Sequence, residues 1–322
     1  MIYRTHTIYL KGENTMICTG AIAGDMIGCK YEFLDFDTEY FRNSHITKTG
    51  LKFSKEDFGY FTDNTVLTLA IKNELNNVQT FNLKPNFEEC CIIDGIPIKY
   101  NFKDALLNPD AGYGMRFYNW LISNNPEPYN SFGNGSAMRV SSIGWHIFTM
   151  DDCMKLAELS AIPTHNHPEG IKGAQAIAAC ILLSRKLHHK SPGMEKKDIK
   201  TYIENKFGYD LSIPLDSLHW DINKNNDSFD ISCQVTVPQA IIAFLESDSF
   251  EEAIINAICI GGDTDTIAAM TGSIAEAYYG VPFYIEKMVG NFLPDDLKEV
   301  LYNDALLETY WSADTHYRNI II

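Results

Sequence analysis

Apolar residues recur at helical spacing along most of this chain. Between residues 63 and 75 they return every three or four positions, at Val66, Leu67, Leu69, Ala70 and Leu75, which predicts a helix with one buried face. The same periodicity predicts helices over residues 17–29, 152–161, 168–188, 236–247, 250–260, 264–279 and 295–308. In the first of these, glycines at positions 20, 24 and 28 indicate a helix that packs closely against a neighbour.

Signals for β-strands are few and short. Residues 46–53 and 92–98 are candidates, but neither sustains an alternation of apolar and polar positions. Residues 189–230 are the most polar tract and are interpreted as an insertion or surface lobe, whereas residues 1–15 are interpreted as an N-terminal arm. No stretch has the composition of a linker. We therefore predict an all-α fold, a compact single-domain bundle of orthogonally packed helices over residues 16–322.

Composition narrows the classes of protein to which the chain can belong. Apolar residues make up 45% of its 322 residues, enough for a substantial core. The net charge of -16, from 26 basic and 42 acidic residues, argues against a nucleic acid as partner. No apolar run reaches membrane length, and no basic-then-apolar leader opens the chain. The eight cysteines are scattered without zinc spacing, so we expect a cytoplasmic protein with no membrane partner.

Two short stretches, far apart in the chain, concentrate oxygen-bearing side chains at the start of predicted helices. One is Thr62-Asp63-Asn64-Thr65, and the other is Asp263-Thr264-Asp265-Thr266, which follows two glycines. Each has the composition of a helix N-cap, but one cap does not need the two acids and two threonines of the second stretch. Hard cations such as Mg²⁺ prefer oxygen ligands. If the two helix starts face each other, the sequence predicts a site for one or two divalent ions.

A glycine-rich stretch, Gly133–Arg139, is a candidate for anion binding. Glycines on both sides of Asn134 let the backbone approach a ligand and present its N–H groups. A helix starting near Ser136 would direct its positive end towards a phosphate. An ordinary turn remains the alternative, and Arg139 is equally suited to phosphate binding and to a structural ion pair.

Histidines and aromatic residues supply weaker candidates. His165, His167 and Glu169 lie close together, but no further ligand at zinc spacing accompanies them. A His that opens a long helix can cap it or can donate a hydrogen bond to a sugar hydroxyl, and we prefer the cap. Tyr113 or Tyr129, in an aromatic segment, could line a pocket wall against a planar base.

Taken in order, these motifs resemble the ADP-ribosylglycohydrolase family, of the dinitrogenase-reductase-activating and ADP-ribosylarginine hydrolase type. The resemblance runs from the glycine-rich helix at Thr19–Gly28 to the last helices. Its most specific pieces are Phe61–Thr65, Gly133–Arg139, Thr164–His167 and Gly261–Thr266. The segments Gly112–Gly114 and Pro128–Phe132 look most like a bacterial subgroup that acts on ADP-ribosylarginine. The resemblance implies an all-α fold with two Mg²⁺ ions in a central cleft.

The resemblance also assigns roles to single residues. The implied metal ligands are Thr62, Asp63, Asn64, Asp263, Asp265 and Thr266. The implied contacts to the ligand's diphosphate and distal ribose are Gly133, Asn134, Gly135, Ser136, Ala137 and Met138, and His165 and Tyr113 are further substrate-binding residues. Asp63, Asn64 and Glu32 form the implied catalytic group. In it Asp63 or a neighbouring acid takes a proton from water, and Glu32 is the candidate that protonates the leaving guanidine.

Asn64 stands where the family usually has a second aspartate. Asparagine offers one neutral oxygen in place of two charged ones, so we predict weaker occupancy of at least one metal position and slower turnover.

The function implied by the resemblance is Mg²⁺-dependent hydrolysis of the N-glycosidic bond between ADP-ribose and a protein arginine, through an oxocarbenium-like transition state. ADP-ribosylserine and O-acetyl-ADP-ribose are alternative substrates. A different class of function is also open: an immunity protein that neutralises an ADP-ribosyltransferase toxin by hydrolysis or by binding. The arm at residues 1–15 motivates that reading, and the acidic surface would suit a basic partner.

Overall fold

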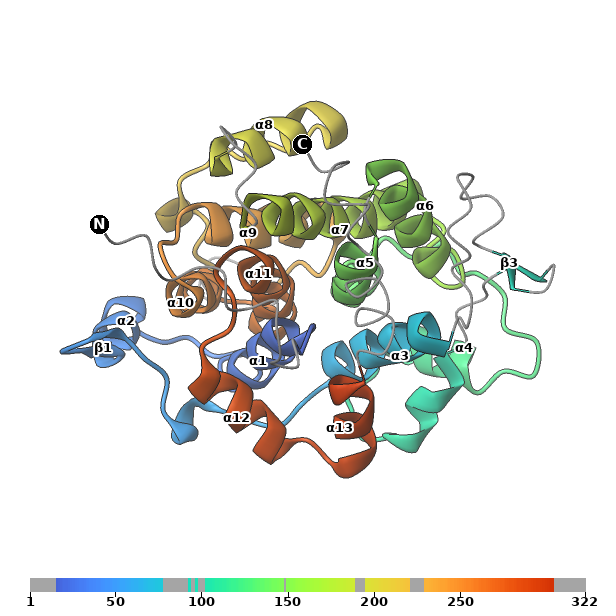
Figure 1. Cartoon of the computed structure of the whole chain (residues 1–322), viewed down its shortest axis with the longest axis horizontal. Helices are drawn as coiled ribbons and strands as arrows, with labels where there is room; N and C mark the ends of the chain where they lie inside the picture. The colour runs from blue at the N-terminus through green and yellow to red at the C-terminus, as the bar shows by residue number, and fades with distance from the viewer. Residues whose placement is uncertain are drawn as a thin grey trace, which may run out of the picture.

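The computed structural model describes residues 16–77, 92–93, 96–97, 102–147, 149–188, 195–220 and 229–303. Its α-helices are α1 (Thr19–Gly28), α2 (Thr38–Ser44), α3 (Asp63–Asn77), α4 (Met115–Leu121), α5 (Ser141–His146), α6 (Met150–Ala161), α7 (Pro168–His188), α8 (Lys196–Phe207), α9 (Cys233–Leu245), α10 (Phe250–Ile260), α11 (Thr264–Tyr279), α12 (Phe283–Phe292) and α13 (Asp295–Tyr302). Short 3-10 helices are η1 (Lys55–Asp57), η3 (Phe102–Leu107), η4 (Asn134–Ser136) and η5 (Leu215–Ser217). Figure 1 shows α1 and α11 near the middle, surrounded by the other helices.

This architecture confirms the predicted all-α class. Within the described ranges, the strands form two hairpins of two-residue strands, β1 (Ile46–Thr47) with β2 (Gly50–Leu51) and β3 (Ile92–Ile93) with β4 (Ile96–Pro97). Both hairpins lie inside the two strand candidates. Each of the long periodic segments became a helix, although residues 304–308 of the last one lie outside the described residues. Periodicity missed α2, α4, α5, α8 and α12.

Helix α1 packs against α11 in an antiparallel pair that has almost no space between the two backbones. A Cβ atom on Gly24 would lie 2.0 Å from the carbonyl oxygen of Ala268, and one on Gly28 would lie 2.5 Å from that of Thr264. The Thr264 hydroxyl also donates to the Gly28 carbonyl at 2.8 Å. The close contact between the two backbones therefore requires glycine at these positions of α1. As a result, the end of α1 lies beside the beginning of α11.

Asp25, the one acid of α1, joins this helix pair to α3. Its carboxylate accepts hydrogen bonds from the backbone N–H of Thr62 at 2.9 Å and of Thr65 at 3.1 Å. Both threonine hydroxyls donate to it as well. A carboxylate at a helix N-terminus satisfies N–H groups that have no partner within the helix. Asp25 thus fixes where α3 begins, next to the start of α11.

The segment between α1 and α3 begins and ends at the same place, next to the C-terminal end of α1. Its two ends are joined by a hydrogen bond from the Gly59 N–H to the Met26 carbonyl at 2.7 Å. A second bond runs from the Cys29 thiol to the Tyr60 carbonyl at 3.0 Å. These contacts hold the residues that follow α1 beside those that precede α3.

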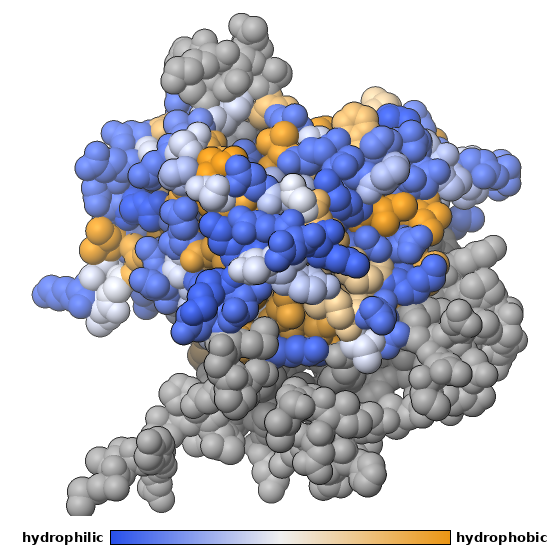
Figure 2. Space-filling model, turned by 90° about the horizontal axis from the view of Figure 1, so that it is seen from above, coloured by the Kyte–Doolittle hydropathy of each residue, from blue (hydrophilic) through white to orange (hydrophobic). Residues whose placement is uncertain are grey.

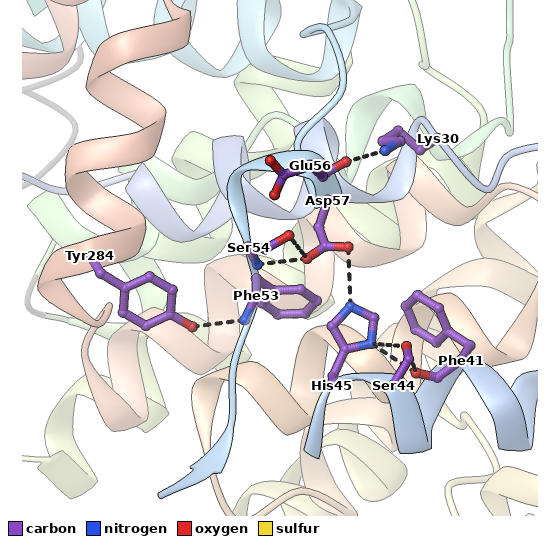
Figure 3. A network of polar contacts seen from close by, with 9 residues as sticks. All are labelled: Lys30, Phe41, Ser44, His45, Phe53, Ser54, Glu56, Asp57 and Tyr284. Carbon is purple, nitrogen blue, oxygen red and sulfur yellow. Dashed lines mark hydrogen bonds and ion pairs between the residues drawn. The ribbon is translucent and has the colours of Figure 1, made fainter. Parts of the chain in front are cut away.

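A polar network stabilises the outer part of this segment (Figure 3). Nε2 of His45 lies 3.3 Å from Asp57, and its Nδ1 lies 2.8 Å from the Phe41 carbonyl. The N–H of Phe53 donates to the Tyr284 hydroxyl of α12 at 3.2 Å. The segment is therefore anchored to a helix near the other end of the chain.

The body is built on a large apolar core in which α1, α10 and α11 are almost entirely buried. In Figure 2, most of the described surface on one face is hydrophilic, with separate apolar areas. Within the tract at residues 189–230, α8 buries Ile199, Ile203 and Phe207 and packs against α7 and α9. Within the described residues, no helix has the length and apolar character needed to cross a bilayer.

Candidate functional site

Three carboxylates converge where α1 ends and α11 begins. Glu32, Asp263 and Asp265 each place an oxygen within 4.8 Å of the others. Asp263 and Asp265 are buried, whereas Glu32 keeps partial exposure. Asp263 is the residue before α11, and Asp265 lies in its first turn, so the two side chains leave the same helix end.

The start of α3 meets this acid cluster, which is the condition that the sequence motifs set for a cation site. The Thr62 hydroxyl lies 3.4 Å from Oδ2 of Asp265, and the Asn64 amide nitrogen donates to the same oxygen at 3.1 Å. The Asn64 nitrogen also donates to Oγ1 of Thr62 at 2.9 Å. The amide oxygen Oδ1 of Asn64 is buried without a hydrogen-bond partner. An oxygen left without a donor beside three carboxylates suits a cation as its partner.

Burial and mutual repulsion raise the pKa values of these acids. Burial first, then the charge of Asp265, raises the pKa of Asp25 to about 7, against the hydrogen bonds that it accepts. The same two causes, with a smaller effect of Asp25, raise the pKa of Glu32 to about 8. Burial and the charge of Asp265 also raise the pKa values of Asp63 and Asp263 well above their ordinary range. Crowded, desolvated carboxylates of this kind are stabilised by a cation, so the donor set fits a divalent metal.

The glycine-rich loop reaches the acid cluster through Asn134. The Asn134 amide nitrogen donates to Oδ2 of Asp263 at 2.6 Å, and its backbone N–H donates to the Ile231 carbonyl at 2.8 Å. Ser136 points away from the cluster, because its hydroxyl donates to the Gly170 carbonyl. The α-helix expected near Ser136 is the single 3-10 turn η4, and Ala137 and Met138 are buried after it.

His165 lies beside this loop. Its Nδ1 is 2.7 Å from the Thr164 hydroxyl, and its Nε2 would be 3.1 Å from a Cβ atom on Gly135. Burial, and then the charges of Arg139 and Arg116, lower the pKa of His165 well below its ordinary range. The capping role falls instead to His167, whose Nδ1 accepts the N–H of Glu169 in the first turn of α7.

Arg139 makes no ion pair with a carboxylate among the described residues. It is fully buried, donates to the Ser160 carbonyl at 2.7 Å and to the Thr164 hydroxyl at 3.0 Å, and lies 4.3 Å from the centre of the Phe102 ring. These contacts hold the Arg139 side chain inside the protein between the end of α6 and η3.

Tyr113 is half-buried, and its hydroxyl donates to the Ala105 carbonyl at 2.8 Å. Burial and then the charge of Asp63 raise the pKa of Tyr113. Thr266 follows Asp265, and its backbone N–H donates to Oδ1 of Asp265 at 2.7 Å.

Two features of the site were missed from the sequence. The first is the role of Asp25, for which a lone acid in a helix of small residues was the available signal. The second is an aromatic group beside the cluster. Phe33 is 60% exposed and has φ +63°, an unusual conformation for a bulky residue. Its ring lies 5.0 Å from that of Phe229, which would be 3.2 Å from a Cβ atom on Gly262.

Together, the fold and the site define a helical protein with an oxygen-rich acid cluster between two helix N-termini and beside a glycine-rich loop. The sequence model described as ADP-ribosylglycohydrolase matches residues 17–314. The chain therefore belongs to the ADP-ribosylglycohydrolase family, which confirms the resemblance and supports ADP-ribosyl hydrolase activity at the level of the family.

Individual relatives agree with this assignment. The chain is 30% identical over 320 residues to ADP-ribosylhydrolase ARH3 of Mus musculus, covering 81% of this chain and 82% of the relative. It is 27% identical over 274 residues to ADP-ribosyl-[dinitrogen reductase] glycohydrolase of Rhodospirillum rubrum, covering 81% and 84%. A solved structure described as an ADP-ribosylglycohydrolase-related protein complex matches with a TM-score of 0.58 at 21% identity, covering 92% of this chain and 97% of that chain. This last likeness concerns the fold alone.

Proposed function

We propose that this chain hydrolyses the bond between ADP-ribose and a modified arginine side chain and that the acid cluster holds Mg²⁺ for this reaction. The observation that carries the proposal is the convergence of Glu32, Asp263 and Asp265 with the start of α3. The hydrogen bond between Asn134 and Asp263 joins this cluster to the loop suited to the diphosphate. One site can therefore hold a cation and an ADP-ribose side by side.

The ligands for the cation come from the two helix starts. Asp263 and Asp265 supply charged oxygens, and Thr62, Asp63, Thr266 and the unpartnered Oδ1 of Asn64 complete the proposed set. When bound there, a divalent cation polarises the oxygens of the substrate and makes a neighbouring water more acidic. Asp25 contributes by positioning, because its hydrogen bonds orient Thr62 and Thr65. The number of ions is part of the proposal: the motif allows one or two, and the family resemblance implies two.

Asp63 and Glu32 are the proposed groups for proton transfer. Asp63 accepts the proton of the attacking water, and Glu32 delivers a proton to the leaving nitrogen. Glu32 also lies close enough to Asp263 and Asp265 to act as a ligand. The variant Glu32→Gln separates these roles. If Glu32 is the proton donor, the variant binds Mg²⁺ normally and turns over slowly. If Glu32 is a metal ligand, the variant binds Mg²⁺ weakly.

The aromatic group beside Glu32 supports arginine as the leaving side chain. Phe33 is 60% exposed, and an exposed aromatic ring is a surface on which a planar guanidinium cation can stack. A serine hydroxyl gains nothing from such a surface, and neither does the acetyl ester of O-acetyl-ADP-ribose.

The test compares substrates under matched conditions. The protein is incubated with arginine-linked and serine-linked ADP-ribosyl peptides and with O-acetyl-ADP-ribose, first in Mg²⁺ and then in EDTA. Release of ADP-ribose from arginine in Mg²⁺, lost in EDTA and restored by added Mg²⁺, is the expected result. Faster release from serine or from the acetyl ester would refute the arginine assignment, and undiminished release in EDTA would refute the role of the cation.

Neutralisation of an ADP-ribosyltransferase toxin by binding is a separate hypothesis. It rests on the arm at residues 1–15, which lies outside the described residues. Deletion of the arm tests it, since toxin binding would be lost while hydrolysis stays intact. The cytoplasmic location likewise remains a prediction from the sequence.

A further inference from the structure

A buried chain of hydrogen bonds leads from Arg139 to His165. The Arg139 guanidinium donates to Oγ1 of Thr164 at 3.0 Å, and this hydroxyl lies 2.7 Å from Nδ1 of His165. Arg139 and Thr164 are both fully buried, and His165 is 6% exposed. Arg139 is held in place by the Ser160 carbonyl and by the face of the Phe102 ring.

The direction of these bonds fixes the protonation of the imidazole. A guanidinium group can only donate, so Oγ1 of Thr164 accepts from Arg139. The single proton of that hydroxyl needs an acceptor, and within the described parts of the chain Nδ1 of His165 is the acceptor within reach. Nδ1 therefore carries no proton. A neutral ring then carries its proton on Nε2, and the low pKa of His165 is consistent with neutrality.

The protonated nitrogen faces the glycine-rich loop. Nε2 of His165 would be 3.1 Å from a Cβ atom on Gly135 and 3.8 Å from one on Gly133. Side chains at these two positions would crowd the imidazole. An N–H donor therefore lies beside the backbone of the loop that Asn134 connects to the acid cluster.

The family resemblance already implies that His165 contacts the ligand. We infer that Arg139 and Thr164 are positioning residues that hold His165 as the neutral Nε2–H tautomer, so that its contact to the bound ADP-ribose is a hydrogen bond donated to an oxygen. The inference rests on the proposed function, because it places the ligand against Gly133–Gly135. The acceptor is either an oxygen of the diphosphate or a hydroxyl of the distal ribose, both of which accept from a neutral N–H. Arg139 acts through Thr164 and does not itself touch the ligand.

The first test is spectroscopic. Long-range ¹H–¹⁵N spectra of the full-length protein distinguish the two neutral tautomers and the imidazolium, and His165→Gln identifies the signals of His165. The expected result is an Nε2–H imidazole in the native protein and in Thr164→Ser, which keeps the hydroxyl. In Thr164→Val the Nε2–H population falls. A native protein with the proton on Nδ1, or on both nitrogens, overturns the inference even if Thr164→Val does not fold.

The second test measures ligand binding. Thr164→Val is expected to bind ADP-ribose about tenfold more weakly, as for one lost hydrogen bond, and Thr164→Ser is expected to bind as the native protein does. Thr271→Val is the matched control, because Thr271 is also buried and its hydroxyl donates to the Ala240 carbonyl. ADP serves as a second probe. Equal weakening for ADP and ADP-ribose assigns the contact to the diphosphate, and weakening for ADP-ribose alone assigns it to the distal ribose.

The outcomes separate this inference from the proposed function. Normal ADP-ribose binding and an unchanged tautomer in Thr164→Val, with hydrolysis intact, overturn the inference and leave the function standing. A native protein that neither binds ADP-ribose nor releases it from arginine overturns both.

Discussion

Asn64 offers the most informative substitution in this protein, because its amide occupies a position suited to a metal-binding carboxylate. The side chain is 1% exposed and donates to Asp265 and Thr62, while its Oδ1 has no partner. In Asn64→Asp without a cation, both hydrogen bonds are lost and a charge is buried beside Asp265. The combined cost is about 3–5 kcal/mol, which lowers the melting temperature by about 10 °C.

A bound cation reverses this effect. A carboxylate at ~4 Å from a cation gains about 4 kcal/mol per unit charge at an effective dielectric constant of about 20, and part of this is offset by desolvation. We therefore expect Mg²⁺ to bind Asn64→Asp about 10- to 100-fold more tightly than the native chain, with faster turnover.

The assay is thermal unfolding in EDTA and in excess Mg²⁺, with Mg²⁺ affinity and stoichiometry measured by calorimetry. Asn256→Asp is the matched control, since Asn256 is equally buried and its amide donates to the Ala243 and Glu246 carbonyls away from the cluster. Its loss of stability should not depend on Mg²⁺. Equal Mg²⁺-induced stabilisation of the native protein and Asn64→Asp would refute the assignment of Asn64 to the metal site. Equal turnover would refute the prediction that Asn64 slows catalysis.

Three further changes have defined outcomes. Gly24→Ala should destabilise the protein by more than about 3 kcal/mol in chemical denaturation, because the new methyl group would collide with the Ala268 backbone. In the control Gly114→Ala the new methyl group contacts nothing, so the change should be nearly neutral. Equal effects of the two substitutions would contradict the close helix contact. Burial lowers the pKa of His45, but hydrogen bonds to Asp57 and to a backbone carbonyl more than offset this, so the folded-state pKa is raised. Protonated His45 therefore stabilises the folded protein. This stabilisation is complete below the unfolded pKa of 6.5 and is lost as pH rises through the folded value. His45→Gln should therefore cost more stability at about pH 5.5 than at about pH 8.5, and a cost independent of pH would exclude the ionised pair. Phe33→Ala should raise KM for an arginine-linked substrate several-fold while leaving that for a serine-linked one unchanged; equal losses would show that the ring does not recognise the guanidinium group.

The helices and the polar residues at their starts were predictable because both depend on local sequence. Apolar spacing identified α3, α7, α10 and α11. The acids and threonines at two helix starts identified residues that the fold brings together as a candidate cation site. The short helices α2, α4 and α5 were not predicted, because six or seven residues form less than two helical turns and show too little periodicity. Helix α8 was not predicted, because its three buried residues lie within a strongly polar tract.

The sequence by itself determined the family, the helical class and the candidate ligands, since these follow from residue types at fixed spacing. Tertiary structure decided which atoms meet. The close packing of α1 against α11 placed Asp25 under the start of α3, turned the amide nitrogen of Asn64 towards Asp265, and set Phe33 beside Phe229. Spacing along the chain carries no information on such contacts, because the distance between two remote side chains depends on how whole helices pack and on which hydrogen bonds their buried groups must satisfy.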